Sequence, residues 1–100
     1  MFTAVVRVTG AGRMEDFRER VRWLMVRDID AEDYSEHHGE HGLEYRFQPR
    51  LGVPFPIFVE ASAEFPELCV EAKWETDTVK GRVLIEAGRL SEREIEKKDG

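Results

Sequence analysis

The sequence has little of what a disulfide, a membrane span or a secretion signal requires. It contains one cysteine, Cys69, so no disulfide can form within the chain, and this usage is typical of a reducing compartment. Its apolar runs are only a few residues long, whereas a helix that spans a bilayer needs about 20. Residues 1–10 include Arg7 and no long apolar stretch, unlike a signal peptide. We therefore expect a cytoplasmic protein that does not bind membranes.

The composition predicts one folded domain. Hydrophobic residues make up 41% and aromatic residues 10% of the 100 residues, which is too much apolar material for a disordered chain. A chain of this length can bury roughly two-thirds of its unfolded surface. We expect a single domain over residues 1–90. Ser91 and Glu94 form a capping box, so residues 91–100 should form a short helical turn or a frayed tail.

Four segments alternate between apolar and polar residues, the pattern of a half-buried strand. They cover residues 2–9, 43–48, 68–75 and 82–87. The side chains expected to face solvent are Thr3, Val5, Arg7, Glu44, Arg46, Gln48, Glu71, Lys73, Glu75, Arg82, Leu84 and Glu86.

Two further segments have helical spacing. Phe17, Val21 and Leu24 recur along residues 13–27, and a shorter helix begins after the prolines at 54 and 56 and ends at Pro66. The order is then β-α-β-α-β-β. Two helices can bury their apolar sides only against one face of the sheet. This predicts an α+β two-layer sandwich of ferredoxin-like type, with both helices on one face of a four-stranded, mainly antiparallel sheet and a right-handed crossover between the first two strands.

Residues 28–42 lack periodicity and predict a long loop. The loop has six acids and no Lys or Arg, while the rest of the chain has equal numbers of acids and bases, so it carries the whole net charge of -6. An acidic cluster attracts basic partners and repels nucleic acid, although such runs are often only solvated. The candidate partner-binding residues are Asp28, Asp30, Glu32, Asp33, Glu36 and Glu40.

The same predicted loop contains every histidine of the chain, at His37, His38 and His41. Imidazole is a ligand for zinc, nickel and copper, so the three are candidate ligands of a divalent transition metal. The spacing matches no zinc-protease motif. A domain without any cofactor is therefore the simpler expectation.

Other motifs do not carry chemistry. Residues 28–39 fail the calcium-loop pattern, since Asp33 and Gly39 stand where it needs glycine and glutamate. The turn from Gly10 to Gly12 lacks the third glycine of a dinucleotide site. The predicted open sheet face carries no aromatic ring, which RNA-recognition sheets need. We expect no direct nucleic-acid binding.

Several short motifs occur together along the chain. They are Gln48-Pro49, Pro54-Phe55-Pro56, the run from Glu64 to Leu68, Trp74-Glu75, Gly81 and Gly88, together with Val8-Thr9-Gly10 and Phe17 nearer the start. With them, residues 43–90 and the first strand and helix resemble the ferredoxin-like domain of the YubB-like proteins of plasmids and phages. The resemblance implies that fold and a mobile-element setting, and it implies no catalytic residues.

Together these features predict a non-enzymatic protein-binding module of a mobile genetic element. One version is a nucleic-acid-mimicking inhibitor of a host defence complex, in which carboxylates stand in for phosphates and bind a basic partner. The alternative is a small homodimeric metal-binding protein or enzyme that uses the histidines. A monomer and a homodimer are both compatible with the sequence.

Overall fold

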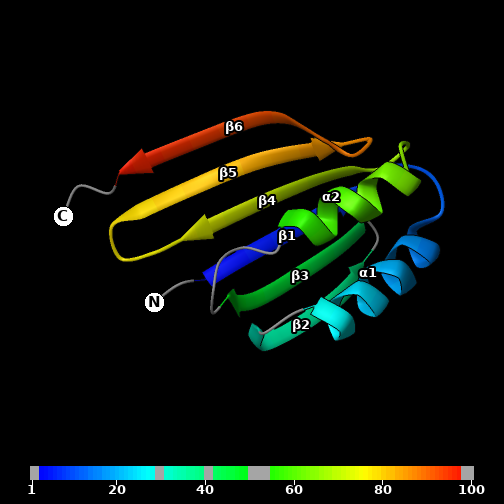
Figure 1. The fold of residues 1–100 in the computed structure, drawn as a ribbon, viewed down its shortest axis with the longest axis horizontal. Helices are drawn as coiled ribbons and strands as arrows, with labels where there is room; N and C mark the ends of the chain where they lie inside the picture. The colour runs from blue at the N-terminus through cyan, green and yellow to red at the C-terminus, as the bar shows by residue number, and fades with distance from the viewer. Residues whose placement is uncertain (1–2, 29–30, 40–41, 50–54, 98–100) are drawn as a thin grey trace.

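The computed structural model of the chain describes residues 3–28, 31–39, 42–49 and 55–97. Within these ranges two helices and six strands follow one another (Figure 1). Their order is β1 (Thr3–Thr9), α1 (Met14–Asp28), β2 (Ala31–Gly39), β3 (Gly42–Pro49), α2 (Phe55–Glu64), β4 (Cys69–Glu75), β5 (Val79–Glu86) and β6 (Arg89–Lys97).

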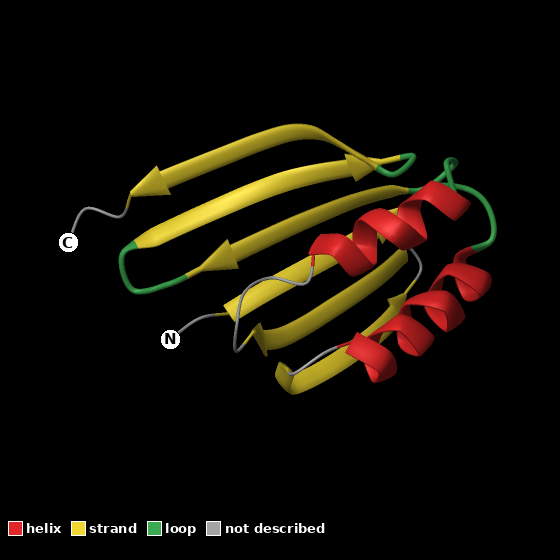
Figure 2. Cartoon of the chain, viewed as in Figure 1, coloured by secondary structure: helices red, strands yellow, loops and turns green. Residues whose placement is uncertain are grey.

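The strands form one sheet in the order β2-β3-β1-β4-β5-β6. Every neighbouring pair is antiparallel. Both helices lie on the same face of this sheet, α1 over the β2–β3 side and α2 nearer its middle (Figure 2). None of the described helices is long and apolar enough to cross a membrane.

The predicted four-stranded, ferredoxin-like sandwich of order β-α-β-α-β-β is wrong, because the sheet has six strands. Residues 31–39, predicted as part of the loop 28–42, form β2. Residues 91–97 belong to β6, although residues 91–100 were expected to form a helical turn or a frayed tail. The right-handed crossover is also absent: β2 reverses the chain once more, so β1 and β3 run antiparallel as neighbours.

The core fills the space between the sheet and the helices. Directly opposite residues such as Val6, Tyr45 and Ala72 share this face of the sheet and are fully buried. Phe17 of α1 meets Phe65, the residue after α2, edge-on with ring centroids 5.6 Å apart, and so joins the two helices. Tyr45 of β3 meets Phe58 of α2 at 5.5 Å and joins the sheet to the helix layer. The predicted inward positions of β1, β3, β4 and β5 are therefore confirmed as core or partly buried.

The turn between β5 and β6 is anchored to α2. Ala87 and Gly88 both have positive φ, 49° and 78°, as in the tight turns that match the twist of a β-hairpin. The buried hydroxyl of Ser62 accepts a hydrogen bond from the Gly88 backbone N–H at 3.1 Å. This hydrogen bond links the turn that precedes β6 to a buried residue of α2.

Candidate functional site

The acidic, histidine-rich segment lies at one edge of the sheet as strand β2. In the β2–β3 register, Glu36 is opposite Tyr45 and His38 is opposite Leu43. Tyr45 and Leu43 are core residues, so Glu36 and His38 are on the face covered by α1. His37 is opposite Glu44 and therefore on the open face.

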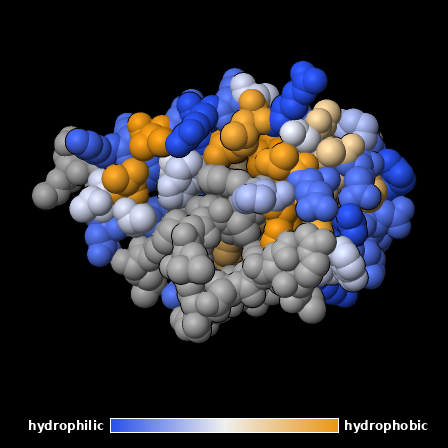
Figure 3. Space-filling model, in the orientation of Figure 1, coloured by the Kyte–Doolittle hydropathy of each residue, from blue (hydrophilic) through white to orange (hydrophobic). Residues whose placement is uncertain are grey.

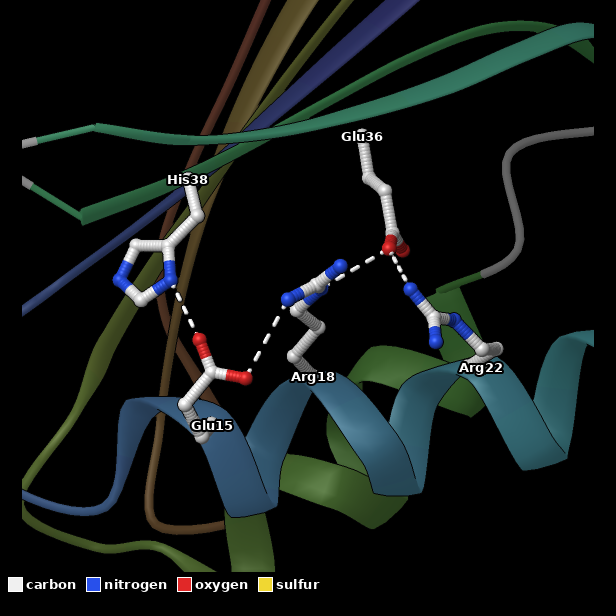
Figure 4. Close-up of polar contacts among 5 residues, drawn as sticks. All are labelled: Glu15, Arg18, Arg22, Glu36 and His38. Carbon is white, nitrogen blue, oxygen red and sulfur yellow. Dashed lines mark hydrogen bonds and ion pairs between the residues drawn. The ribbon is translucent and has the colours of Figure 1, made fainter.

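Glu36 joins β2 to helix α1 (Figure 4). Its carboxylate accepts a hydrogen bond from Nε of Arg18 at 2.9 Å and another from Arg22. Only 14% of the Glu36 side chain is exposed. The hydrogen bond to Glu36 raises the pKa of Arg18 and of Arg22 above their ordinary value. Glu36 thus pairs within the protein instead of projecting into water.

His38 extends the same contact surface toward the start of α1. Its Nδ1 lies 2.6 Å from a carboxylate oxygen of Glu15, and the other oxygen of Glu15 is 3.2 Å from Arg18 (Figure 4). These contacts link Glu15, Arg18, Arg22, Glu36 and His38, which we call the α1–β2 clamp. The clamp connects the inner face of β2 to helix α1 through charged side chains.

Replacing Glu36 by glutamine tests the clamp. E36Q keeps the side-chain size but removes the charge that two guanidinium groups share, so we expect a lower urea midpoint than for the unaltered protein. The loss should be smaller than that of a core truncation. E19Q is the control, since Glu19 is exposed on α1 and the clamp does not include it. Equal urea midpoints for the two variants would contradict the clamp.

The other predicted partner-binding acids are distributed over two elements of the backbone. Asp28 ends α1, whereas Glu32 and Asp33 belong to β2, with Glu32 opposite Gln48. Asp30 and Glu40 lie outside the described residues. The structure therefore divides the predicted acidic loop between a helix end and an edge strand.

The predicted metal ligands are also separated. His37 and His38 are on opposite faces of β2, because neighbouring residues of a strand point to opposite sides. His41 lies outside the described residues. In the part of the chain that the structure describes, no three His, Cys, Asp or Glu side chains are grouped so that they could hold a metal ion.

The open face of the sheet, which the helices do not cover, carries a network of ion pairs. Arg46 and Arg7 both donate to Glu44, at 3.1 and 3.0 Å, and these hydrogen bonds lower the pKa of Glu44. Arg82 donates to Glu71 at 2.7 Å and lowers its pKa in the same way. Such pairs stabilise the fold above the ordinary carboxyl pKa and lose this effect as the pH falls through the lowered one.

A depression of 390 Å³ lies on this open face where β1, β4, β5 and β6 pass side by side. Its lining combines charges of both signs with the apolar side chains of Val5 and Trp74. Its charged lining is Lys73, Glu75, Lys80, Arg82, Glu94 and Glu96.

Cys69 is not an activated thiol. Burial raises the pKa of the thiol, and the hydrogen bond that its Sγ donates to Glu86 at 3.6 Å raises it further. The thiolate is the nucleophilic form, so a raised pKa lowers reactivity at neutral pH. Cys69 therefore has the properties of a residue that packs in the fold and not of a nucleophile.

Sequence reasoning missed the edge strand β6, all nine residues of which are exposed. It pairs with β5 on one side, and no described strand lies on its other side. Leu90 and Ile95 lie on the helix-bearing face, opposite Ile85 and Gly81, yet 52% and 55% of these residues are exposed. Figure 3 shows hydrophobic side chains on the β5–β6 side of this face. The sequence feature that could have indicated this strand is the alternation of Glu92, Glu94 and Glu96.

The two edges of the sheet therefore differ. At β2 the α1–β2 clamp engages Glu36 and His38 of the inner face, whereas at β6 the apolar side chains of Leu90 and Ile95 are more than half exposed. No protein-family model, no curated protein and no solved structure matches the chain.

Proposed function

We propose that this chain is a non-enzymatic protein-binding module that accepts an extended segment of a partner protein as an additional strand on β6. The observation that carries the proposal is a nine-residue edge strand, exposed throughout, with Leu90 and Ile95 more than half exposed. The free edge of a strand offers backbone donors and acceptors to an incoming strand. Exposed apolar side chains on the same strand then add contact area.

Because Glu36 is already bound within the protein, we place the proposed binding surface on β6 and not on residues 28–42. A carboxylate that already binds Arg18 and Arg22 is poorly placed to replace a phosphate, so the nucleic-acid-mimicking version receives no support from Glu36. The separation of His37 from His38 likewise gives no support to the metal-dependent alternative. The edge of β6 requires neither a metal nor a catalytic group.

A mobile-element setting remains part of the proposal. It rests on the resemblance to the YubB-like proteins, and the single cysteine supports a cytoplasmic location. Plasmid or phage genes beside the gene for this chain would support the setting. A neighbourhood of ordinary chromosomal genes would contradict it without affecting the binding proposal.

Affinity capture with matched variants tests the function. The tagged full chain, L90K/I95K and W23K are used to capture proteins from cells of the source organism, and quantitative mass spectrometry compares them. Trp23 is the matched control, because it is also 55% exposed but lies on α1. We expect a protein retained by the unaltered chain and by W23K, and reduced about tenfold with L90K/I95K. Equal retention by all three would contradict the proposal.

A further inference from the structure

We infer that the partner segment is a basic amphipathic strand, with Lys or Arg at alternate positions on one face and an apolar residue on the other. This inference rests on the proposed function and specifies the partner's chemistry. It follows from the two faces of β6, which present different side chains to anything that pairs with its free edge.

One face of β6 carries a row of carboxylates. Glu92, Glu94 and Glu96 are opposite Leu84, Arg82 and Lys80, so all three belong to the open face of the sheet. Their side chains are 59%, 71% and 73% exposed. Next to a strand added on the free edge, alternate residues of that strand would lie beside this row.

Arg82 and Lys80 contact this row from strand β5. Arg82 is 3.5 Å from Glu92 and 3.7 Å from Glu94, and it is closer to Glu71, at 2.7 Å. Lys80 lies 3.4 Å from Glu96. One guanidinium is thus shared by three carboxylates, so Lys or Arg side chains of a partner would gain favourable contacts here.

A second copy of the chain does not fit this edge. Two β6 strands related by a two-fold axis run antiparallel, and their faces must match. Any such register that overlaps residues 92–96 places a glutamate of one copy opposite a glutamate of the other. Like charges directly opposite destabilise a strand pair. The row of glutamates therefore favours a basic segment of a different protein over a second copy of this chain.

The other face of β6 presents Ile95 between two bases. Arg93 and Lys97 are opposite Val83 and Val79, while Ile95 is opposite Gly81, which has no side chain and is itself opposite Trp74. An apolar side chain of the partner opposite Ile95 would cover the exposed surface of this residue, whereas a base there would lie beside Arg93 and Lys97. Charge on one face and an apolar residue on the other together fix the register of the added strand.

Three peptides test this chemistry on the full chain: Lys-Val-Lys-Val-Lys-Val-Lys, its glutamate counterpart Glu-Val-Glu-Val-Glu-Val-Glu, and a control of the first composition without alternation, Lys-Lys-Val-Val-Val-Lys-Lys. Backbone amide NMR titrations report the site and the Kd. We expect shifts over residues 89–97 with the first peptide, and a Kd at least about tenfold weaker with the other two.

Matched charge variants localise the effect. E94Q/E96Q should weaken binding of the alternating lysine peptide about threefold or more, while D16N/E19Q, which changes the net charge equally on α1, should not. Equal binding of the lysine and glutamate peptides at 89–97 would overturn the inference but leave the proposed function intact. No shift in β6 with any peptide would also overturn it, because the glutamates would then only protect the edge. The proposed function itself would be contradicted if L90K/I95K retained the captured protein as well as the unaltered chain does.

Discussion

Replacing Phe17 by alanine is expected to reduce the free energy of unfolding by about 3–5 kcal/mol. Phe17 is fully buried on the inner side of α1 and contacts Phe65 edge-on. Truncation would remove apolar contact area and leave a cavity between the two helices, since the surrounding layers relax only partially. For a domain with a total stability of about 5–15 kcal/mol, F17A removes a large share. Urea unfolding followed by circular dichroism measures the change.

Trp23 on the same helix is the control. It is the larger side chain, but 55% of it is exposed, and the guanidinium of Arg20 lies over its ring at 5.0 Å from the centroid. We expect W23A to change the stability by less than about 1 kcal/mol. A similar loss for both variants would mean that the helix does not present the side described here to the sheet.

Replacing Gly42 by alanine is expected to cost about 2–4 kcal/mol. Gly42 has a φ of 133°, a conformation that residues with a side chain rarely adopt. A Cβ there would also overlap the Val8 carbonyl oxygen, and β1 cannot move without disturbing its pairing with β3. The variant should therefore show a lower unfolding midpoint in urea.

Gly39 provides a control from the facing strand, because it pairs directly with Gly42. A Cβ at Gly39 would come no closer than 3.4 Å to a neighbouring side chain, which is an ordinary contact. G39A should leave the unfolding midpoint nearly unchanged. If G42A were as well tolerated as G39A, the β2–β3 hairpin would have to differ from the one described.

Periodicity predicted the parts of the fold that face the core. The spacing of Phe17, Val21 and Leu24 correctly identified the inner side of α1, and all three are fully buried. Strict alternation likewise predicted which side chains of β1, β3, β4 and β5 point inward. These elements were predictable because each buries apolar side chains on one side, and burial imposes the period of the backbone on the sequence.

Strand β2 was not predictable in this way because Glu36 and His38, on its inner face, are polar. Glu36 and His38 face the charged side chains of α1, so the apolar alternation expected of a strand is absent. A local pattern cannot show that Arg18 and Arg22, earlier in the chain, supply the partners. The acidic residues of this segment were therefore attributed to a loop, although one of them, Glu36, binds helix α1 to the edge of the sheet.

Strand β6 was missed for a different reason. The register between β5 and β6 shifts next to Leu84 and Ile85, so Leu90 and Ile95 share a face although they are an odd number of residues apart. This shift breaks the period of two that identifies a strand. The alternating glutamates kept the period, but charged residues are not the usual marker of a strand.

The most direct test of the β6 edge is amide hydrogen exchange in the full chain, measured alone and with saturating alternating lysine–valine peptide. Addition of a strand would pair backbone amides along the free edge, so we predict slower exchange within residues 89–97 and no change within residues 31–39. Slower exchange in 31–39 with 89–97 unchanged would contradict binding at β6 and assign it to the opposite edge of the sheet.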